Sequence, residues 1–289
     1  MDFDISTVRI SPGEQVDLNK RPTKVDDLYL DKIEYKALLK ANVRRLSDAQ
    51  ERFYADGRHA LLIIFQAMDT AGKDGAIEHV LSGVNPQGCI VHSFRHPSAT
   101  ELEHDFLWRT TQALPSKGMI GVFNRSYYEE VLVVRVHPEV LAAEKVAGSG
   151  ERDSFWRHRF ESINNQEEHL HRNGTRILKF FLHLSKKEQK KRLLSRIDDP
   201  DKRWKFSPND LIERELWDSY MHAYAEALKA TSTADSPWYC IPADDKKNAR
   251  LMVSDVILKT IEGLKPEFPA VTPEQEKGLL EARAQLEKS

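Results

Sequence analysis

The chain of 289 residues has no apolar run that approaches the roughly 18 residues needed to cross a membrane. Its first residues, MDFDISTVRISPGEQ, lack the apolar segment of a signal peptide. Cysteine is scarce: Cys89 and Cys240 form no C-x-x-C pair and lie in apolar runs, so we expect buried thiols in a reducing compartment. Because 43 Lys and Arg residues meet 45 Asp and Glu residues, the net charge is −2 and no general attraction to nucleic acid is expected. The sequence thus predicts a cytoplasmic protein without membrane or nucleic-acid partners.

What the sequence does contain is a series of short apolar runs that alternate with helix-forming segments. We predict strands at 61–65, 89–94, 119–123, 177–184 and 238–241. We predict helices near 75–82, 99–113, 127–134, 155–172, 186–196 and 209–230. This alternation is typical of an α/β fold with a parallel sheet of about five strands between helices, and such folds bind ligands at the carboxyl ends of their strands.

The pattern predicts a single domain over residues 1–289. Residues 1–56 form a polar, irregular arm and a long amphipathic helix from about Leu28 to Ala55, which Gly57 ends. Residues 185–210 form a basic segment, and residues 266–289, rich in Glu, Lys and Ala, predict a surface helix.

The segment LLIIFQAMDTAGKDGAIEHV, residues 61–80, indicates a phosphate-binding loop. A buried strand is followed by a loop that holds Gly72 and Lys73, and then by a helix. In this order backbone N–H groups and the helix N-terminus converge on an anion, and the lysine reaches the transferring phosphate. The phosphate contacts assigned to the loop are Ala71, Gly72, Asp74 and Gly75. Taken alone, the pattern also fits a chance Gly-Lys pair in a turn.

Two positions depart from the usual G-x-x-x-x-G-K-[ST] pattern. Ala67 replaces the first glycine, and Asp74 replaces the hydroxyl residue that normally binds Mg²⁺. A carboxylate beside phosphates repels them unless a metal lies between, so we expect Asp69 or Asp74 to face a divalent cation, Mg²⁺ or Mn²⁺.

Polar residues also follow the third predicted strand, in the sequence NRSYYEE. Asn124 stands where an aspartate often serves a metal, and Arg125 offers a charged fork for phosphate oxygens. Glu129 can serve a metal or a ribose, and Tyr128 is assigned to nucleotide binding with it. The alternative is that Arg125 and Glu129 only pair on a helix surface, worth about a few tenths of a kcal/mol.

The basic segment 185–210 has the composition of a lid that closes over phosphates. Arg192 and Arg196 share one helix face, and Lys205 lies in the loop that follows. The alternative is a solvated charged face. Arg95 and Arg109 are further candidates for an acceptor phosphate, or for structural ion pairs.

On these residues the chain resembles the family-2 polyphosphate kinases from about Asp27 to Lys265, and it is most similar to their class III subgroup. The matching motifs are Ala67–Gly75, Phe123–Glu129, Lys191-Arg192 with Arg196, and Asp199–Pro208. The resemblance implies a P-loop kinase-like, three-layer α/β/α sandwich with a helical lid. It implies transfer of the terminal phosphoryl group of inorganic polyphosphate to AMP and ADP, giving ADP and ATP.

We therefore expect catalysis by positioning and charge neutralisation. Lys73 and Arg125 would contact the transferring phosphoryl group, and the two lid arginines would grip the donor chain. The catalytic assignments are Asp69, Lys73, Arg125, Arg192 and Arg196, and the metal assignments are Asp69, Asn124 and Glu129. A homo-oligomer, either a dimer or a tetramer, is expected.

Two other functions fit parts of the sequence. An ATP-dependent kinase of a small metabolite or nucleoside monophosphate would use the same loop, although the long basic segment favours a longer anion. A non-catalytic polyanion-binding protein would need only residues 186–205 and would leave Asp69 and Lys73 without a role.

Overall fold

The computed structural model describes residues 3–143, 146 and 152–288. Its centre is one parallel five-stranded sheet in the order β2-β3-β1-β4-β5. The strands are β1 Ala60–Gln66, β2 Cys89–Ser93, β3 Ile120–Asn124, β4 Thr175–His183 and β5 Trp238–Pro242. All five predicted strands and the parallel α/β class are confirmed.

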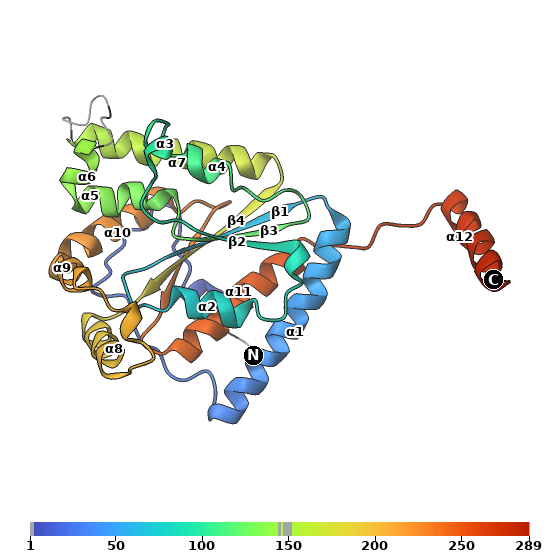
Figure 1. The fold of residues 1–289 in the computed structure, drawn as a ribbon, viewed down its shortest axis with the longest axis horizontal. Coiled ribbons are helices and arrows are strands. Elements are labelled where there is room, and N and C mark those ends of the chain that lie inside the picture. The colour runs from blue at the N-terminus through green and yellow to red at the C-terminus, as the bar shows by residue number, and fades with distance from the viewer. Residues whose placement is uncertain (1–2, 144–145, 147–151, 289) are drawn as a thin grey trace.

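Helices cover both faces of the sheet, which makes three layers (Figure 1). One face carries α1 Lys32–Asp56, α2 Lys73–Val80 and α11 Lys246–Gly263. The other carries α7 Arg152–Arg172, α10 Trp217–Thr231 and the short α5 Val133–Val136. The remaining helices are α3 Ala99–Leu102, α4 Trp108–Thr111, α6 Pro138–Ala143, α8 Lys186–Asp198, α9 Asn209–Glu215 and α12 Pro273–Leu286, with 3-10 turns at Ile5–Thr7, Pro86–Gly88, Tyr127–Val131 and Arg203–Lys205.

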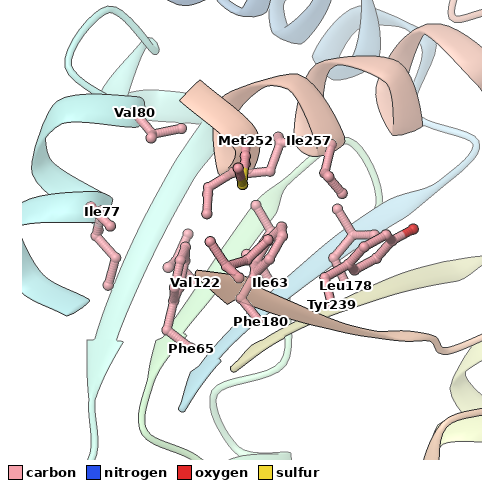
Figure 2. Packing of buried hydrophobic residues seen from close by; sticks show 14 of the residues in the cluster. Ile63, Phe65, Ile77, Val80, Val122, Leu178, Phe180, Tyr239, Met252 and Ile257 are labelled. Atoms are coloured by element: carbon pink, nitrogen blue, oxygen red, sulfur yellow. The ribbon is translucent and has the colours of Figure 1, made fainter. Parts of the chain in front are cut away.

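Strand β1 feeds both cores because successive side chains of a strand point to opposite faces. Ile63 and Phe65 face the core under α1, α2 and α11, whereas Leu62 and Ile64 face the core under α7 and α10. Figure 2 shows the first core, in which Ile63 and Phe65 lie among side chains of β3, β4, β5 and the helices α2 and α11. Each fully buried aliphatic or aromatic side chain contributes about 1.5–3 kcal/mol of hydrophobic stabilisation.

The helix predictions needed four corrections. Helix α11 was not predicted, because its polar and apolar residues show no clear amphipathic period; most of the helix is buried, including Asn248, Ser254 and Asp255. The segment 99–113 forms two short helices, and 127–134 begins as a 3-10 turn. The segment 209–230 breaks at Leu216 into α9 and α10.

The N-terminal arm is more ordered than predicted. Arg9 forms an antiparallel bridge with Tyr239, and the amide of Ile10 donates to the carbonyl of Trp238 at 2.9 Å. The arm therefore covers the outer edge of β5. Helix α1 ends at Gly57 with a φ of 62°, as predicted. Cys240 is buried, whereas Cys89 is only half-buried.

Helix α12 lies away from the body of the protein on an extended segment (Figure 1), and its residues are exposed, as predicted for a surface helix. Among the described residues, no helix has the length and apolar character required to span a membrane.

Candidate active site

The predicted phosphate loop joins β1 to α2 at the carboxyl edge of the sheet. Gly72 caps α2 with a φ of 103°, a left-handed conformation that favours glycine. Thr70 also has a positive φ, 65°, which is strained for a β-branched residue. Helix α2 begins at Lys73, so its N-terminus directly follows the loop, and the amide of Ala71 donates to the carbonyl of Met68 at 3.3 Å.

The Lys73 side chain is buried within this loop. Its ammonium donates to the carbonyl oxygen of Ala67 at 2.8 Å. Burial, together with the positive charge of Arg125, lowers the pKa of Lys73 to about 8, while Asp69 and Glu129 act in the opposite direction. A phosphate at the loop would favour the charged ammonium.

The sheet register brings the segment after β3 beside the loop. Phe65 of β1 pairs with Asn124 of β3, and the amide of Arg125 donates to the carbonyl of Phe65 at 3.0 Å. Asn124 Nδ2 donates to Asp74 Oδ1 at 2.6 Å. The phosphate loop and the polar segment after β3, both predicted from the sequence, are therefore in contact through Asp74 and Asn124.

Arg125 lies between two carboxylates. Its guanidinium is 3.1 Å from Asp69 and 3.5 Å from Glu129. Glu129 and then Asp69 stabilise the charged form and raise the pKa of Arg125. Gln66, which sequence reasoning missed, donates to Glu129 at 2.7 Å. The local Arg125–Glu129 pair does form, but Asp69 and Gln66 extend it into a cluster from two segments, 66–69 and 125–129.

The oxygen atoms of this cluster belong to carboxylates and a side-chain amide, which are ligands that Mg²⁺ prefers. Asp69 and Glu129 flank Arg125, and Asp74 accepts from Asn124. In the described part of the chain, no three acidic, His or Cys side chains are already gathered as a metal site.

The lid arginines have different surroundings. Arg196 is partly exposed and contacts the carbonyl of Lys205 and the carboxylate of Asp210 at 3.3 and 3.4 Å. Arg192 is buried, 7% exposed, and bonds to backbone carbonyls of the phosphate loop. Lys205 is exposed, and its ammonium lies over the Trp204 ring.

Arg95 and Arg109 lie at the end of β2 and in α4. Arg109 Nη1 donates to the carbonyl of Arg95 at 2.7 Å, and its guanidinium is 3.8 Å from Glu130. Arg109 and Glu130 also line a hollow of about 310 Å³ with Phe106 and residues of α7. Arg109 therefore has the predicted structural ion pair, while Arg95 is exposed.

Tyr128 requires a correction. Its side chain is fully buried, so in this arrangement it offers no surface to a nucleotide. Its hydroxyl donates to Glu167 at 2.8 Å and accepts from Lys179 at 3.0 Å, while Tyr127 donates to the same carboxylate at 2.9 Å. Tyr128 thus anchors the segment that carries Arg125 to Glu167 and Lys179 in the core.

Two cations of α11 were also missed. A Cβ atom placed at Gly72 would lie 4.0 Å from Lys246 Cε. A Cβ atom placed at Gly75 would lie 3.2 Å from Arg250 Nη2. Gly75 therefore permits close packing of α2 against Arg250. Because helix α11 was not predicted, nothing in the sequence analysis indicated that Lys246 and Arg250 approach the loop.

The Lys179–Glu167 ion pair is buried, with exposures of 0% and 2% for the two side chains. Replacing Lys179→Met leaves Glu167 without its partner, so we expect a loss of about 3–5 kcal/mol in the free energy of unfolding. Denaturation in urea measures this loss. The double variant Lys179→Met/Glu167→Gln should recover part of it, and Lys229→Met on the exposed face of α10 should change little. A loss below about 1 kcal/mol for Lys179→Met would contradict the role of the pair.

Known proteins resemble this chain over most of its length. The family Polyphosphate kinase 2 (PPK2) matches residues 29–269. The chain is 63% identical over 279 residues to the ADP-polyphosphate phosphotransferase of Rhodopseudomonas palustris, with 96% of each chain covered. It is 46% identical over 238 residues to the AMP/ADP-polyphosphate phosphotransferase of Meiothermus ruber, covering 82% of this chain and 85% of that one.

The crystal structure of Polyphosphate Kinase 2 from Arthrobacter aurescens TC1 has the same fold, with a TM-score of 0.84, 40% sequence identity and 94% of each chain covered. The resemblance to the family is thereby confirmed, and the assignment to its class III subgroup stays a prediction. A phosphate loop, an arginine held between two carboxylates and these matches lead to one conclusion: the chain belongs to the polyphosphate kinase 2 family.

Proposed function

We propose that the protein transfers the terminal phosphoryl group of inorganic polyphosphate to ADP, giving ATP, and also to AMP, giving ADP. The observation that carries this proposal is the meeting of Lys73 with the Asp69–Arg125–Glu129 cluster at one sheet edge, in a PPK2 chain. The relatives named above act on ADP, or on AMP and ADP, by their names.

The acceptor needs no strong base, because a nucleotide phosphate is already an anion. One of its terminal oxygens forms a bond to the last phosphorus of the donor, and the bridging P–O bond behind that phosphorus breaks. The shortened polyphosphate leaves with the bridging electrons. Catalysis then consists of alignment and of compensation for charge on the transferring oxygens.

Lys73 and Arg125 are suited to these oxygens. Lys73 lies in the loop and Arg125 beside it. In the described part of the chain the Lys73 ammonium donates to the Ala67 carbonyl, and its further N–H donors can meet phosphate oxygens. Arg125 keeps its place through Asp69 and Glu129 and presents its remaining donors. Arg196 and Lys205 supply charge from the lid side. On the acceptor side, Arg95 is exposed and adjoins Arg109.

The cofactor in this proposal is Mg²⁺, or Mn²⁺ in its place. Asp69 would hold it, with Glu129 and the Asn124 carbonyl as further oxygen ligands, and Asp74 lies beside Asn124. The ion would neutralise part of the negative charge of the phosphates. It would also offset the repulsion between the phosphates and these carboxylates.

The oligomeric state stays a prediction of a dimer or a tetramer. The exposed leucines of α12, Leu279, Leu280 and Leu286, are in keeping with contacts between copies. Light scattering coupled to size-exclusion chromatography measures it directly, and a monomer at micromolar concentration would contradict it.

The assay that tests the activity contains the protein, Mg²⁺, polyphosphate and a nucleotide, without added ATP. We expect ATP from ADP, and from AMP we expect ADP first and ATP after it. Product from ADP alone would remove AMP as a substrate. Transfer only when ATP is supplied would instead support an ordinary ATP-dependent kinase.

Asp69→Ala and Lys73→Ala should each lower turnover at least ~10²-fold, because each removes a preorganised charge at the reacting phosphates. Lys277→Ala, on exposed α12, is the matched control and should keep full activity. Circular dichroism checks that each variant is folded. A folded Lys73→Ala enzyme with normal turnover would refute the assignment.

The lowered pKa of Lys73 predicts a pH dependence. The free enzyme loses the ammonium charge as the pH rises through about 8, so kcat/KM for polyphosphate should fall there. Bound phosphates favour the charged form, so the fall in kcat should come at higher pH. Steady-state rates between pH 6.5 and pH 10 measure both profiles. A kcat/KM that stays constant over this range would contradict the role of Lys73.

A further inference from the structure

We propose that Arg192 is a positioning residue that holds the phosphate loop in shape, and that it does not bind the donor chain. The guanidinium lies behind the loop, on the inner face of α8. Its Nη1 donates to the carbonyl oxygens of Thr70 at 3.1 Å and Ala71 at 2.8 Å. Two consecutive carbonyls of the loop therefore point at one side chain.

The other donors of Arg192 are engaged as well. Nη2 donates to the carbonyls of Ala243 at 2.7 Å and Asp244 at 3.0 Å, and Nε donates to Glu188 at 3.0 Å. A guanidinium has five N–H donors, and five contacts account for all of them. A polyphosphate chain could bind the Arg192 guanidinium only by displacing carbonyls such as those of Ala71 and Ala243, which would then be buried without a hydrogen-bond partner.

Asp244, whose carbonyl accepts from Arg192, is itself held in place by hydrogen bonds. Asp244 follows β5, and its carboxylate accepts from the Thr23 hydroxyl at 2.9 Å and from the Ser185 amide at 2.8 Å. Ser185 caps α8, the helix that carries Arg192. The arginine thus ties the phosphate loop to a frame built from the N-terminal arm, the end of β5 and the start of α8.

The direction of these bonds decides which way the loop amides point. In a trans peptide the C=O and the N–H lie on opposite sides. Holding the Ala71 carbonyl toward Arg192 therefore turns the Gly72 amide away from it. The same bonds support Thr70 in its strained conformation, which persists only where its surroundings hold it.

Arg196, one turn further along α8, is the natural comparison. It is more exposed than Arg192, and its contacts of 3.3 and 3.4 Å are longer. It can exchange them for phosphate oxygens at lower cost. A contact with the donor therefore belongs to Arg196, and the shape of the loop depends on Arg192.

The first test is hydrogen–deuterium exchange of the free, full-length protein, read at peptides that cover residues 66–76. Arg192→Lys and Arg192→Gln should each speed exchange at the loop at least about tenfold, because fewer carbonyls are held. Arg196→Lys and Arg196→Gln should leave it unchanged. Equal exchange in the wild type and both Arg192 variants would overturn the proposal. This readout needs no substrate, so it decides the inference even if the proposed activity fails.

The second test is steady-state kinetics with ADP and polyphosphates of short and long chain length, and it alone rests on the proposed function. We expect Arg192→Lys to lower kcat at least about tenfold, since a misplaced loop impairs alignment. Its KM for polyphosphate should stay within about twofold at every chain length. Arg196→Lys should instead raise that KM. A raised KM for polyphosphate with unchanged kcat in Arg192→Lys would overturn the proposal. Loss of folding in both Arg192 variants, with both Arg196 variants folded, would support a structural role.

Discussion

The parallel pairing of β1 with its two neighbours is the constraint on which the site depends. Phe65 is opposite Asn124 on one side and Phe180 on the other, so the strands end at a common edge. Segments far apart in the sequence emerge there together: the loop with Asp69 and Lys73, and the turn with Arg125. A shift of one residue in this register would turn the inward side chains of β1 to the wrong face.

Two buried charges near the site, Lys179 and Arg192, are compensated by the groups around them. Lys179 on β4 meets Glu167 and the hydroxyl of Tyr128. Arg192 donates to four backbone carbonyls and one carboxylate. Such networks often add less stability than apolar packing would, but moving one partner leaves a buried charge without compensation, which costs several kcal/mol. That property suits a loop and a turn that must present amides and guanidinium groups to phosphates in fixed directions.

The success of the sequence predictions followed the strength of the local signal. Apolar runs marked all five strands, and the segment after the Gly72-Lys73 pair marked helix α2 to within two residues of its observed start at Lys73. Helix α11 was missed because Asn248, Ser254 and Asp255 lie among its buried residues, so the apolar positions follow no clear helical period. Tyr128 was assigned to a ligand because it neighbours Glu129, although adjacent residues of a turn can face the core and the solvent in alternation.

The sequence by itself determined the α/β class, the order of the elements, the phosphate loop and the family, because each depends on local periodicity or on motif spacing. The tertiary structure alone decided that Arg192 is buried and Arg196 is partly exposed. Arg192 and Arg196 lie one helical turn apart and have the same chemistry, so nothing local separates them. They differ because α8 packs Arg192 against carbonyls of the loop and of the segment after β5, more than 50 residues away along the chain in both directions. Burial and partner geometry of that kind exist only once the chain has folded.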